Sequence, residues 1–311
     1  MRKFLASILA VGGVLISAGA ARATPSTTYW APSTTYIQPY LVPHITYDTY
    51  FWKGPNAGAA GSPLYPIDTG ITIGVLPFEK LQLELGYDLL LPTENSLLFL
   101  LNAKLGTPEG TFFNGSPSLA AGIFGVGIKG KSDSNPGTSY DVVYGQVQKN
   151  LPWGGFVSVG GYYGAGTKEL WLDKADATGK EHRAGFMGAI CSPDIPVDLP
   201  GLKKLVVAGD VQTGNNVYGA AGGGLYLYFT DTIDILTGPV YFFDADMQPG
   251  GKHWMWTVQL DVDIPFKAAP PAPAAAAPPA PEPAAAPAAA PAPAAAPAEA
   301  PAPSPTPPSG T

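Results

Sequence analysis

Apolar and polar side chains alternate along many segments of about ten residues that recur through most of the chain. The clearest is 253–266, HWMWTVQLDVDIPF, which places Trp254, Trp256 and Val258 on one face and Gln259 and Asp261 on the other. A period of two is typical of β-strands. The alternation predicts about twelve strands, near residues 40–52, 67–77, 80–90, 96–105, 118–129, 138–149, 153–164, 183–192, 203–213, 217–229, 232–243 and 253–266.

The connectors between these strands alternate in length. Those after the second, sixth and tenth strands are tight, whereas several of the others are polar and longer, such as 165–183 and 244–252. Short turns at one end and longer loops at the other are typical of bacterial outer-membrane barrels. Connectors 106–117 and 193–202 depart from this pattern. They should lie at the end with the short turns, but they are not short. A soluble β-sandwich would show the same strand alternation and is an alternative.

Composition changes at both ends of the alternating region. Residues 1–23 have a basic start, an apolar run and the sequence Ala21-Arg22-Ala23, which together predict a secretory signal peptide. Residues 24–39 hold a tandem repeat, STTYWAP followed by STTYIQP, which we expect to be extended, either as a spacer lying in the periplasm or as a plug that enters the lumen. Residues 267–311 are rich in Ala and Pro and predict a disordered tail without a core.

Three features together resemble a Gram-negative outer-membrane β-barrel protein of the porin-like class, without indicating one family. They are the signal peptide, the even number of alternating strands and the final strand that ends in the aromatic Phe266. The resemblance covers residues 40–266 and implies an all-β, antiparallel, up-and-down transmembrane barrel in the outer membrane, with the tail in the periplasm. Aromatic residues near strand ends, among them Trp52, Trp153, Trp254, Trp256 and the pairs at 162–163 and 242–243, fit the girdles of such barrels.

The resemblance also implies partners. They are outer-membrane lipid and the barrel-assembly machinery, for which Phe266 is the candidate signal. In the class this aromatic normally ends the chain, whereas 45 residues follow it here. The tail is similar to Ala-Pro hinges that join some barrels to a peptidoglycan-binding domain, so peptidoglycan is a candidate partner of the tail.

The strand phase predicts which polar side chains face the lumen. With the apolar faces toward lipid, the inward candidates are His44, Asp48, Glu84, Asp88, Lys104, Asp210, Asp261 and Asp263. Without the three basic residues of the signal peptide, the chain has 14 Lys and Arg against 24 Asp and Glu, a balance of −10. An open acidic lumen would concentrate cations and repel anions. The alternative is that these side chains are only hydrated or paired inside a closed barrel. A nucleic-acid partner is not expected, because it would need a basic surface.

The predicted function is a passive, porin-like channel for small hydrophilic solutes. The alternative is a structural or interaction protein of the outer membrane, whose Ala/Pro tail contacts the periplasm or the cell wall. The two differ in a measurable way, because only the channel requires a lumen that conducts.

No enzymatic activity, cofactor or metal site is expected. Cys191 is the only cysteine, which excludes an intrachain disulfide and thiolate zinc clusters. Residues 125–132 match the phosphate-loop pattern, but a turn follows where that motif requires a helix. No serine in a recognisable catalytic motif accompanies His44, His182 or His253. Neither acidic pair, Asp173 with Asp176 or Asp244 with Asp246, has the spacing of a calcium loop.

Overall fold

The computed structural model describes residues 33–51, 67–93, 96–127, 139–173, 176, 178–248 and 251–266. The predicted signal peptide, the first copy of the repeat, Trp52, most of the phosphate-loop match and the predicted tail lie outside the described residues. The helices of the described part are two three-residue 3-10 turns, η1 (Lys168–Leu170) and η2 (Ala245–Met247). None of its helices has the length and apolar character needed to cross a membrane.

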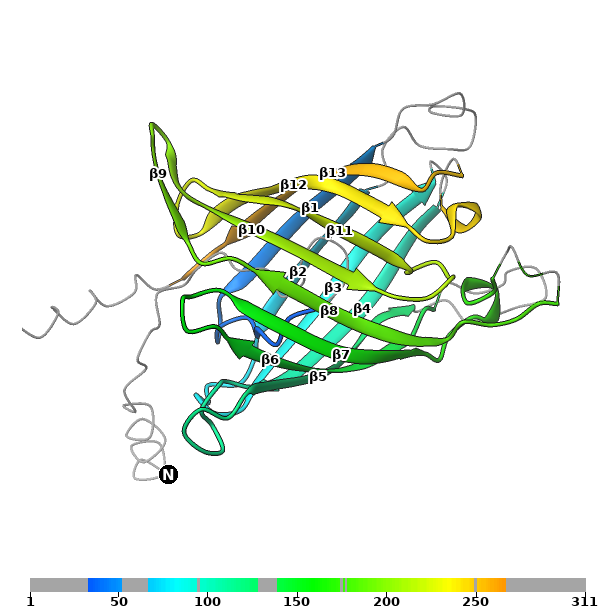
Figure 1. Ribbon diagram of the computed structural model, residues 1–311. Coiled ribbons are helices and arrows are strands. Elements are labelled where there is room, and N and C mark those ends of the chain that lie inside the picture. The colour runs from blue at the N-terminus through cyan, green and yellow to red at the C-terminus, as the bar shows by residue number, and fades with distance from the viewer. Residues whose placement is uncertain are drawn as a thin grey trace, which may run out of the picture. The chain divides into compact units, whose positions relative to one another are not determined.

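The described chain forms thirteen strands, twelve of which close into an antiparallel barrel (Figure 1). Neighbours in sequence pair with one another, and the first and last strands pair from His44 opposite Asp263 to Phe51 opposite Trp256, which closes the sheet. The all-β barrel prediction is confirmed. The strands are β1 (Pro43–Phe51), β2 (Ile67–Gly74), β3 (Gln82–Thr93), β4 (Ser96–Thr107), β5 (Ser118–Gly127), β6 (Val142–Asn150), β7 (Phe156–Gly164), β8 (Ala184–Cys191), β9 (Ile195–Leu199), β10 (Leu202–Gln212), β11 (Ala220–Tyr228), β12 (Ile233–Phe242) and β13 (Trp254–Asp263).

Strand β9 lies outside the closed barrel, in the segment 193–202 that was expected to be a plain connector. It pairs with the start of β10, Leu199 opposite Leu202, along the same edge of β10 that β8 occupies further on. It therefore prolongs β8 after a break at 192–194, where Pro193 supplies no N–H group for a strand ladder. The β9–β10 hairpin projects beyond the rim of the barrel (Figure 1). Five residues are too few for the alternation to reveal such a strand.

The last strand is shorter than predicted. Strand β13 ends at Asp263, and Pro265 follows shortly afterwards, so Phe266 lies beyond the strand and is exposed to solvent. A proline within the predicted strand 253–266 removes one ladder donor, which explains the earlier end. Whether Phe266 acts as an assembly signal stays a prediction.

The two rims of the barrel differ only in part as the connector lengths predict, because the connector between β3 and β4, at the rim of the longer loops, spans only residues 94–95. We call the rim at which β1 begins and β13 ends the terminal end, and the opposite rim the loop end. The tight turn between β6 and β7 at the terminal end requires Gly155, which has a φ of 71° and leaves no room for a side chain against the carbonyl of Cys191. The longer connector 108–117 is tied to the same rim, because Glu109 accepts hydrogen bonds from Lys149 Nζ and from the backbone N–H of Asn150. The bond from Lys149 lowers the pKa of Glu109.

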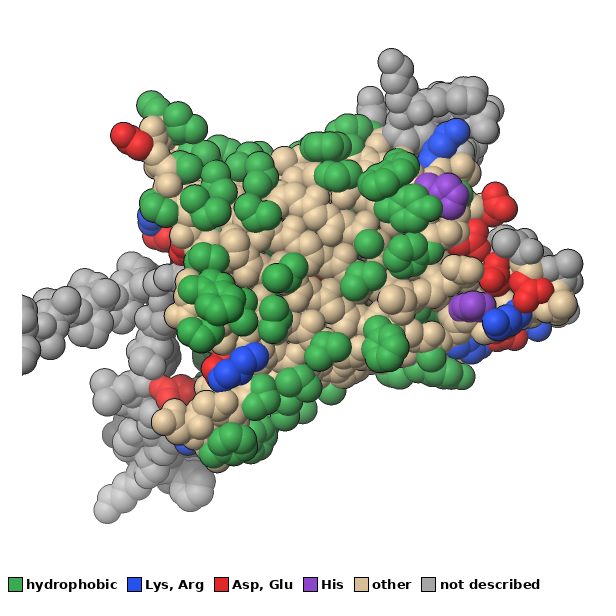
Figure 2. Space-filling model, viewed as in Figure 1, with side chains coloured by type: hydrophobic (Ala, Val, Ile, Leu, Met, Phe, Trp, Pro, Cys, Tyr) green, Lys and Arg blue, Asp and Glu red, His purple; other side chains and the backbone are tan. Residues whose placement is uncertain are grey.

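The outer wall is apolar between the two rims. Large hydrophobic side chains such as Leu85, Leu101, Val159 and Ile190 are exposed, each on the strand face opposite to the buried positions. Figure 2 shows hydrophobic side chains along the wall between areas of backbone and uncharged polar side chains, with charged side chains gathered toward its ends. This distribution is the one expected for a barrel surrounded by lipid, and it argues against a sandwich with a dry core between two sheets.

The aromatic girdles are only partly as predicted. At the terminal end the exposed aromatic side chains of the described residues are Tyr40, Phe78, Phe112, Phe113, Trp153, Phe229 and Phe266. Near the loop end Tyr163 and Trp254 are exposed, but Tyr162 and Phe242 are buried inside the barrel. The assignment of the whole pairs 162–163 and 242–243 to the girdle is therefore wrong, because adjacent residues of a strand point to opposite faces.

Candidate functional site

The barrel interior is the candidate functional site, and the inward candidates lie on its wall. Six of the eight are buried, whereas Asp48 and Asp88 are partly accessible. Two further acids, Asp68 and Asp234, also face inward and were missed. Both faces of the strand around Asp234 carry apolar side chains, Ile233 and Ile235 on one face and Leu236 and Val240 on the other. The sequence therefore does not indicate which face of this strand points inward.

Residues 33–39, the second copy of the tandem repeat, lie inside the barrel at the terminal end. We call them the plug segment. Ser33, Thr34, Thr35, Ile37 and Gln38 are buried. Three inward side chains hold the beginning of the segment: Ser158 donates to the Ser33 carbonyl, Gln148 Oε1 accepts from the Thr35 N–H at 3.1 Å, and Ser118 Oγ lies 2.7 Å from Thr35 Oγ1. Of the two expectations for the repeat, a spacer or a plug, the described copy has the position of a plug.

Gln38 anchors the other end of the plug segment to two carboxylates. Its backbone N–H donates to Glu84 Oε2 at 2.7 Å, and its side-chain Nε2 donates to Asp263 Oδ1 at 2.8 Å. Each carboxylate has a basic neighbour on the adjacent strand, because Lys104 Nζ lies 3.7 Å from Glu84 and His44 Nδ1 lies 3.0 Å from Asp263.

The wall around this anchor is shaped to let the segment approach closely. A Cβ atom at Gly74 would lie 2.1 Å from the carbonyl oxygen of Gln38, and one at Gly106 would lie 2.9 Å from the Ile37 side chain. Real Cβ atoms do not make contacts that short, so glycine is required at Gly74, where the obstacle is backbone. We refer to this lining as the seat of the plug segment.

An acidic wall formed by Asp48, Asp68 and Asp88 lies on three consecutive strands. Asp48 is directly opposite Asp68, and Asp88 is opposite Gly70, two residues along β2 from Asp68. Thr46 donates to Asp48 and Asn102 donates to Asp88, each at 2.6 Å, whereas Asp68 Oδ1 has no hydrogen-bond partner. All three residues are partly accessible. Each of these carboxylates that is ionised adds negative potential to the lumen.

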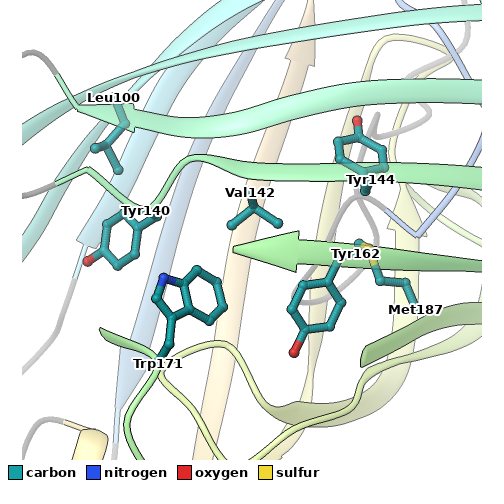
Figure 3. Packing of buried hydrophobic residues seen from close by; sticks show 7 residues of the cluster. All are labelled: Leu100, Tyr140, Val142, Tyr144, Tyr162, Trp171 and Met187. Carbon is teal, nitrogen blue, oxygen red and sulfur yellow. The ribbon is translucent and has the colours of Figure 1, made fainter. Parts of the chain in front are cut away.

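An aromatic cluster narrows the interior toward the loop end (Figure 3). Its buried members are Leu100, Tyr140, Val142, Tyr144, Tyr162, Trp171 and Met187. Trp171 belongs to the connector 165–183, which was expected only as a polar loop, yet its side chain is 0 % exposed. Its ring lies 6.2 Å from that of Tyr162 and 6.0 Å from that of Tyr218. The run Leu170-Trp171-Leu172 within an otherwise polar loop was the available signal.

The loop is fixed in this inward position by hydrogen bonds around Trp171. Arg183 Nη1 donates to the carbonyls of Gly164 and Gly166, and Asn216 Nδ2 donates to the carbonyl of His182 at 2.7 Å. A Cβ atom at Gly164 would lie 2.0 Å from the Trp171 ring, so the indole packs directly on bare backbone. The loop therefore covers part of the interior at this rim.

Each of the three histidines contacts an oxygen atom of a neighbouring residue. His44 lies between Asp261 and Asp263, His182 Nε2 lies 3.5 Å from Asp173 Oδ2, and His253 Nδ1 lies 2.7 Å from the Phe242 carbonyl. Asp244 caps η2 by accepting from the Asp246 N–H. In the described part of the chain, no group of three or more His, Cys, Asp or Glu side chains is arranged to hold a metal ion.

Comparisons with known proteins add only a general likeness in fold. No protein-family model matches the chain, and neither does any curated protein. Among solved structures, the outer membrane phospholipase A of Escherichia coli is 13% identical, covering 74% of this chain and 94% of its own, with a TM-score of 0.41. The corresponding protein of Salmonella typhi, a dimer with bound calcium, is 13% identical over 79% of this chain and 99% of its own, with a TM-score of 0.42. The NanC porin is 7% identical over 71% and 100%, with a TM-score of 0.41.

Proposed function

We propose that the protein is an outer-membrane barrel that passes small hydrophilic solutes passively and favours cations over anions. The acidic wall is the observation that carries this proposal. Three carboxylates line one side of the lumen and stay partly accessible, and the hydroxyl of Thr46 and the amide of Asn102 donate to Asp48 and Asp88. A narrow passage with one sign of charge enriches counter-ions and excludes ions of like charge.

The size limit of the passage follows from the two ends of the lumen. Barrels of eight strands are filled by side chains and those of sixteen enclose a water channel, so twelve strands fall between. Here the plug segment occupies the terminal end and the aromatic cluster lies toward the loop end. We therefore infer a narrow passage for single small solutes. The outer-membrane location is supported by the apolar wall together with the predicted signal peptide.

The proposal predicts ion selectivity that depends on the acidic wall. Reconstituted protein in planar bilayers should conduct in discrete steps, and its reversal potential in a salt gradient should show several-fold preference for cations. Replacing Asp48, Asp68 and Asp88 together by Asn should move that ratio close to unity, because the charge is removed while the shape is kept.

The matched control replaces three exposed carboxylates outside the lumen wall by Asn in the same way. They are Asp198, Asp231 and Asp246. This control variant should keep the wild-type selectivity, since charges outside the passage are screened over about 10 Å in 0.1 M salt. Equal effects of the two triple variants would contradict the assignment. Bilayers that stay silent with folded protein would overturn the channel and favour the alternative, a structural protein acting through its tail.

A further inference from the structure

A second acidic cluster, distinct from the acidic wall, is buried beside the plug segment. Asp234 on β12 is 0 % exposed and lies directly opposite Asp261 on β13. Asp263 follows two residues later on the same inward face, and its Oδ1 accepts from the Gln38 side chain. His44 lies across from both β13 carboxylates, with Nε2 3.4 Å from Asp261 Oδ1 and Nδ1 3.0 Å from Asp263 Oδ1. We call these four side chains the carboxylate cluster.

Several buried oxygen atoms of this region have no hydrogen-bond partner. They are both carboxylate oxygens of Asp234, Oδ2 of Asp261, Oδ2 of Asp263 and, on the neighbouring plug segment, Oε1 of Gln38. All five are acceptors. A buried acceptor without a donor is costly, and a buried ionised carboxylate without compensation costs more. What the cluster needs is therefore a hydrogen-bond donor with positive charge.

The basic side chains around the cluster do not supply enough positive charge to balance its carboxylates. Lys204 Nζ lies 2.9 Å from Asp194 Oδ2 and stacks over the Tyr228 ring, and Lys104 is paired with Glu84. Of the basic groups, His44 lies within ion-pair distance of the cluster carboxylates. Its single positive charge, when it is protonated, would face three carboxylates. The titratable groups that face the cluster are His44 and Asp48 from β1, Glu84 from β3, Lys104 from β4, Lys204 from β10, Tyr228 from β11, Asp234 from β12 and Asp261 and Asp263 from β13.

We propose that the carboxylate cluster is a proton-binding site, in which Asp234 and Asp261 share one proton at neutral pH. Residues directly opposite one another in an antiparallel pair have Cβ atoms about 4.5–5.5 Å apart, which brings two carboxyl groups within hydrogen-bond reach. One carboxyl then donates its O–H to an oxygen of the other, so two of the unpartnered acceptors are satisfied and one negative charge is removed. Two carboxylates that share a dry site behave in this way.

The shared proton is coupled to the plug segment through the β13 carboxylates. His44 bridges Asp261, which shares the proton, and Asp263, which holds Gln38. Loss of the proton adds a negative charge beside Asp263. We therefore expect the region around Gln38 to respond to pH even though Gln38 itself does not titrate.

Infrared spectroscopy tests the proposal directly. The folded protein in detergent at about pH 7 should show the C=O stretch of a protonated, buried carboxyl group, although free Asp is ionised well below that pH. Asp234→Asn should abolish the band, because its amide can donate to Asp261 in place of the proton. Asp198→Asn on the exposed strand β9 carries the same charge change and should leave the band intact.

Stability supplies a second readout. The native state would keep a proton that unfolded Asp releases above about pH 4, so wild-type stability should fall as the pH rises above that value. Asp234→Asn should flatten that slope, whereas Asp198→Asn should retain it. If Asp234→Asn does not fold, Asp261→Asn serves in its place. Absence of the band in folded wild-type protein would overturn the proposal, and so would a stability that depends on added Ca²⁺ or Mg²⁺ and is abolished by a chelator.

Discussion

Deleting residues 24–39 is expected to raise the single-channel conductance several-fold. The plug segment occupies the lumen at the terminal end, where its contacts come from five strands spread around the barrel, through Ser118, Gln148, Ser158, Glu84 and Asp263. All these partners are polar, so water can hydrate them once the plug segment is deleted. Removal of the segment therefore does not expose an apolar surface at these positions. The deletion should therefore open the passage without unfolding the barrel.

The control keeps the chain length and removes only the contacts. Replacing residues 33–39 by a Gly/Ser stretch of equal length should give conductance close to that of the deletion, because such a linker is flexible and has no side chains matched to the seat. Gln38→Ala should have an intermediate effect, since the backbone bond to Glu84 survives. Unchanged conductance in both the deletion and the linker variant would show that the plug segment does not limit flow.

The second large effect is expected at the opposite rim. Replacing the fully buried Trp171 by Ala should destabilise the closed loop 165–183 by about 3–5 kcal/mol, which is a factor of roughly 10² or more in the population of open loop. The twelve paired strands do not depend on this side chain, so we expect local opening and not global unfolding. The rate of trypsin cleavage after Lys168 and Lys180 measures that opening.

Trp153→Ala is the matched control for this substitution. Trp153 is 70 % exposed at the terminal end and contacts no part of the aromatic cluster in the described residues. Its loss should change anchoring in lipid or detergent and leave cleavage in the loop as in the wild type. Similar cleavage rates for wild type and Trp171→Ala would mean that the indole does not hold the loop closed.

The barrel could be predicted from sequence because its signal is local. Each strand places lipid-facing side chains such as Leu260 and polar inward side chains such as Gln259 at alternate positions. This alternation can be recognised within one segment, before it is known which strands pair with each other. The inward orientation of the β13 acids followed from the same phase. Strand ends were less accurate where a proline intervened, as at Pro265.

The features that shape the lumen were not predictable in the same way. Gln38 has no sequence neighbour that indicates Glu84 or Asp263 as partners, since those residues lie on strands far along the chain. Trp171 lies in a polar loop, where the short apolar run 170–172 marks it but does not indicate which rings it packs against inside the barrel. Asp234 lies on a strand that is apolar on both faces, so neither its direction nor its pairing with Asp261 could be read from the pattern.

Closure of the barrel has a consequence for the order of assembly. The seat of the plug segment combines Glu84 on β3 with Asp263 on β13, and β13 is also the strand that pairs with β1 to close the sheet. Contacts between residues this far apart in the chain form slowly, because the intervening loop must be closed first. Until β13 docks, Gln38 lacks one of its two anchors. We therefore expect capture of the plug segment to coincide with closure as one late step, so that a barrel arrested before closure would still have its N-terminal segment free to be extended or cleaved.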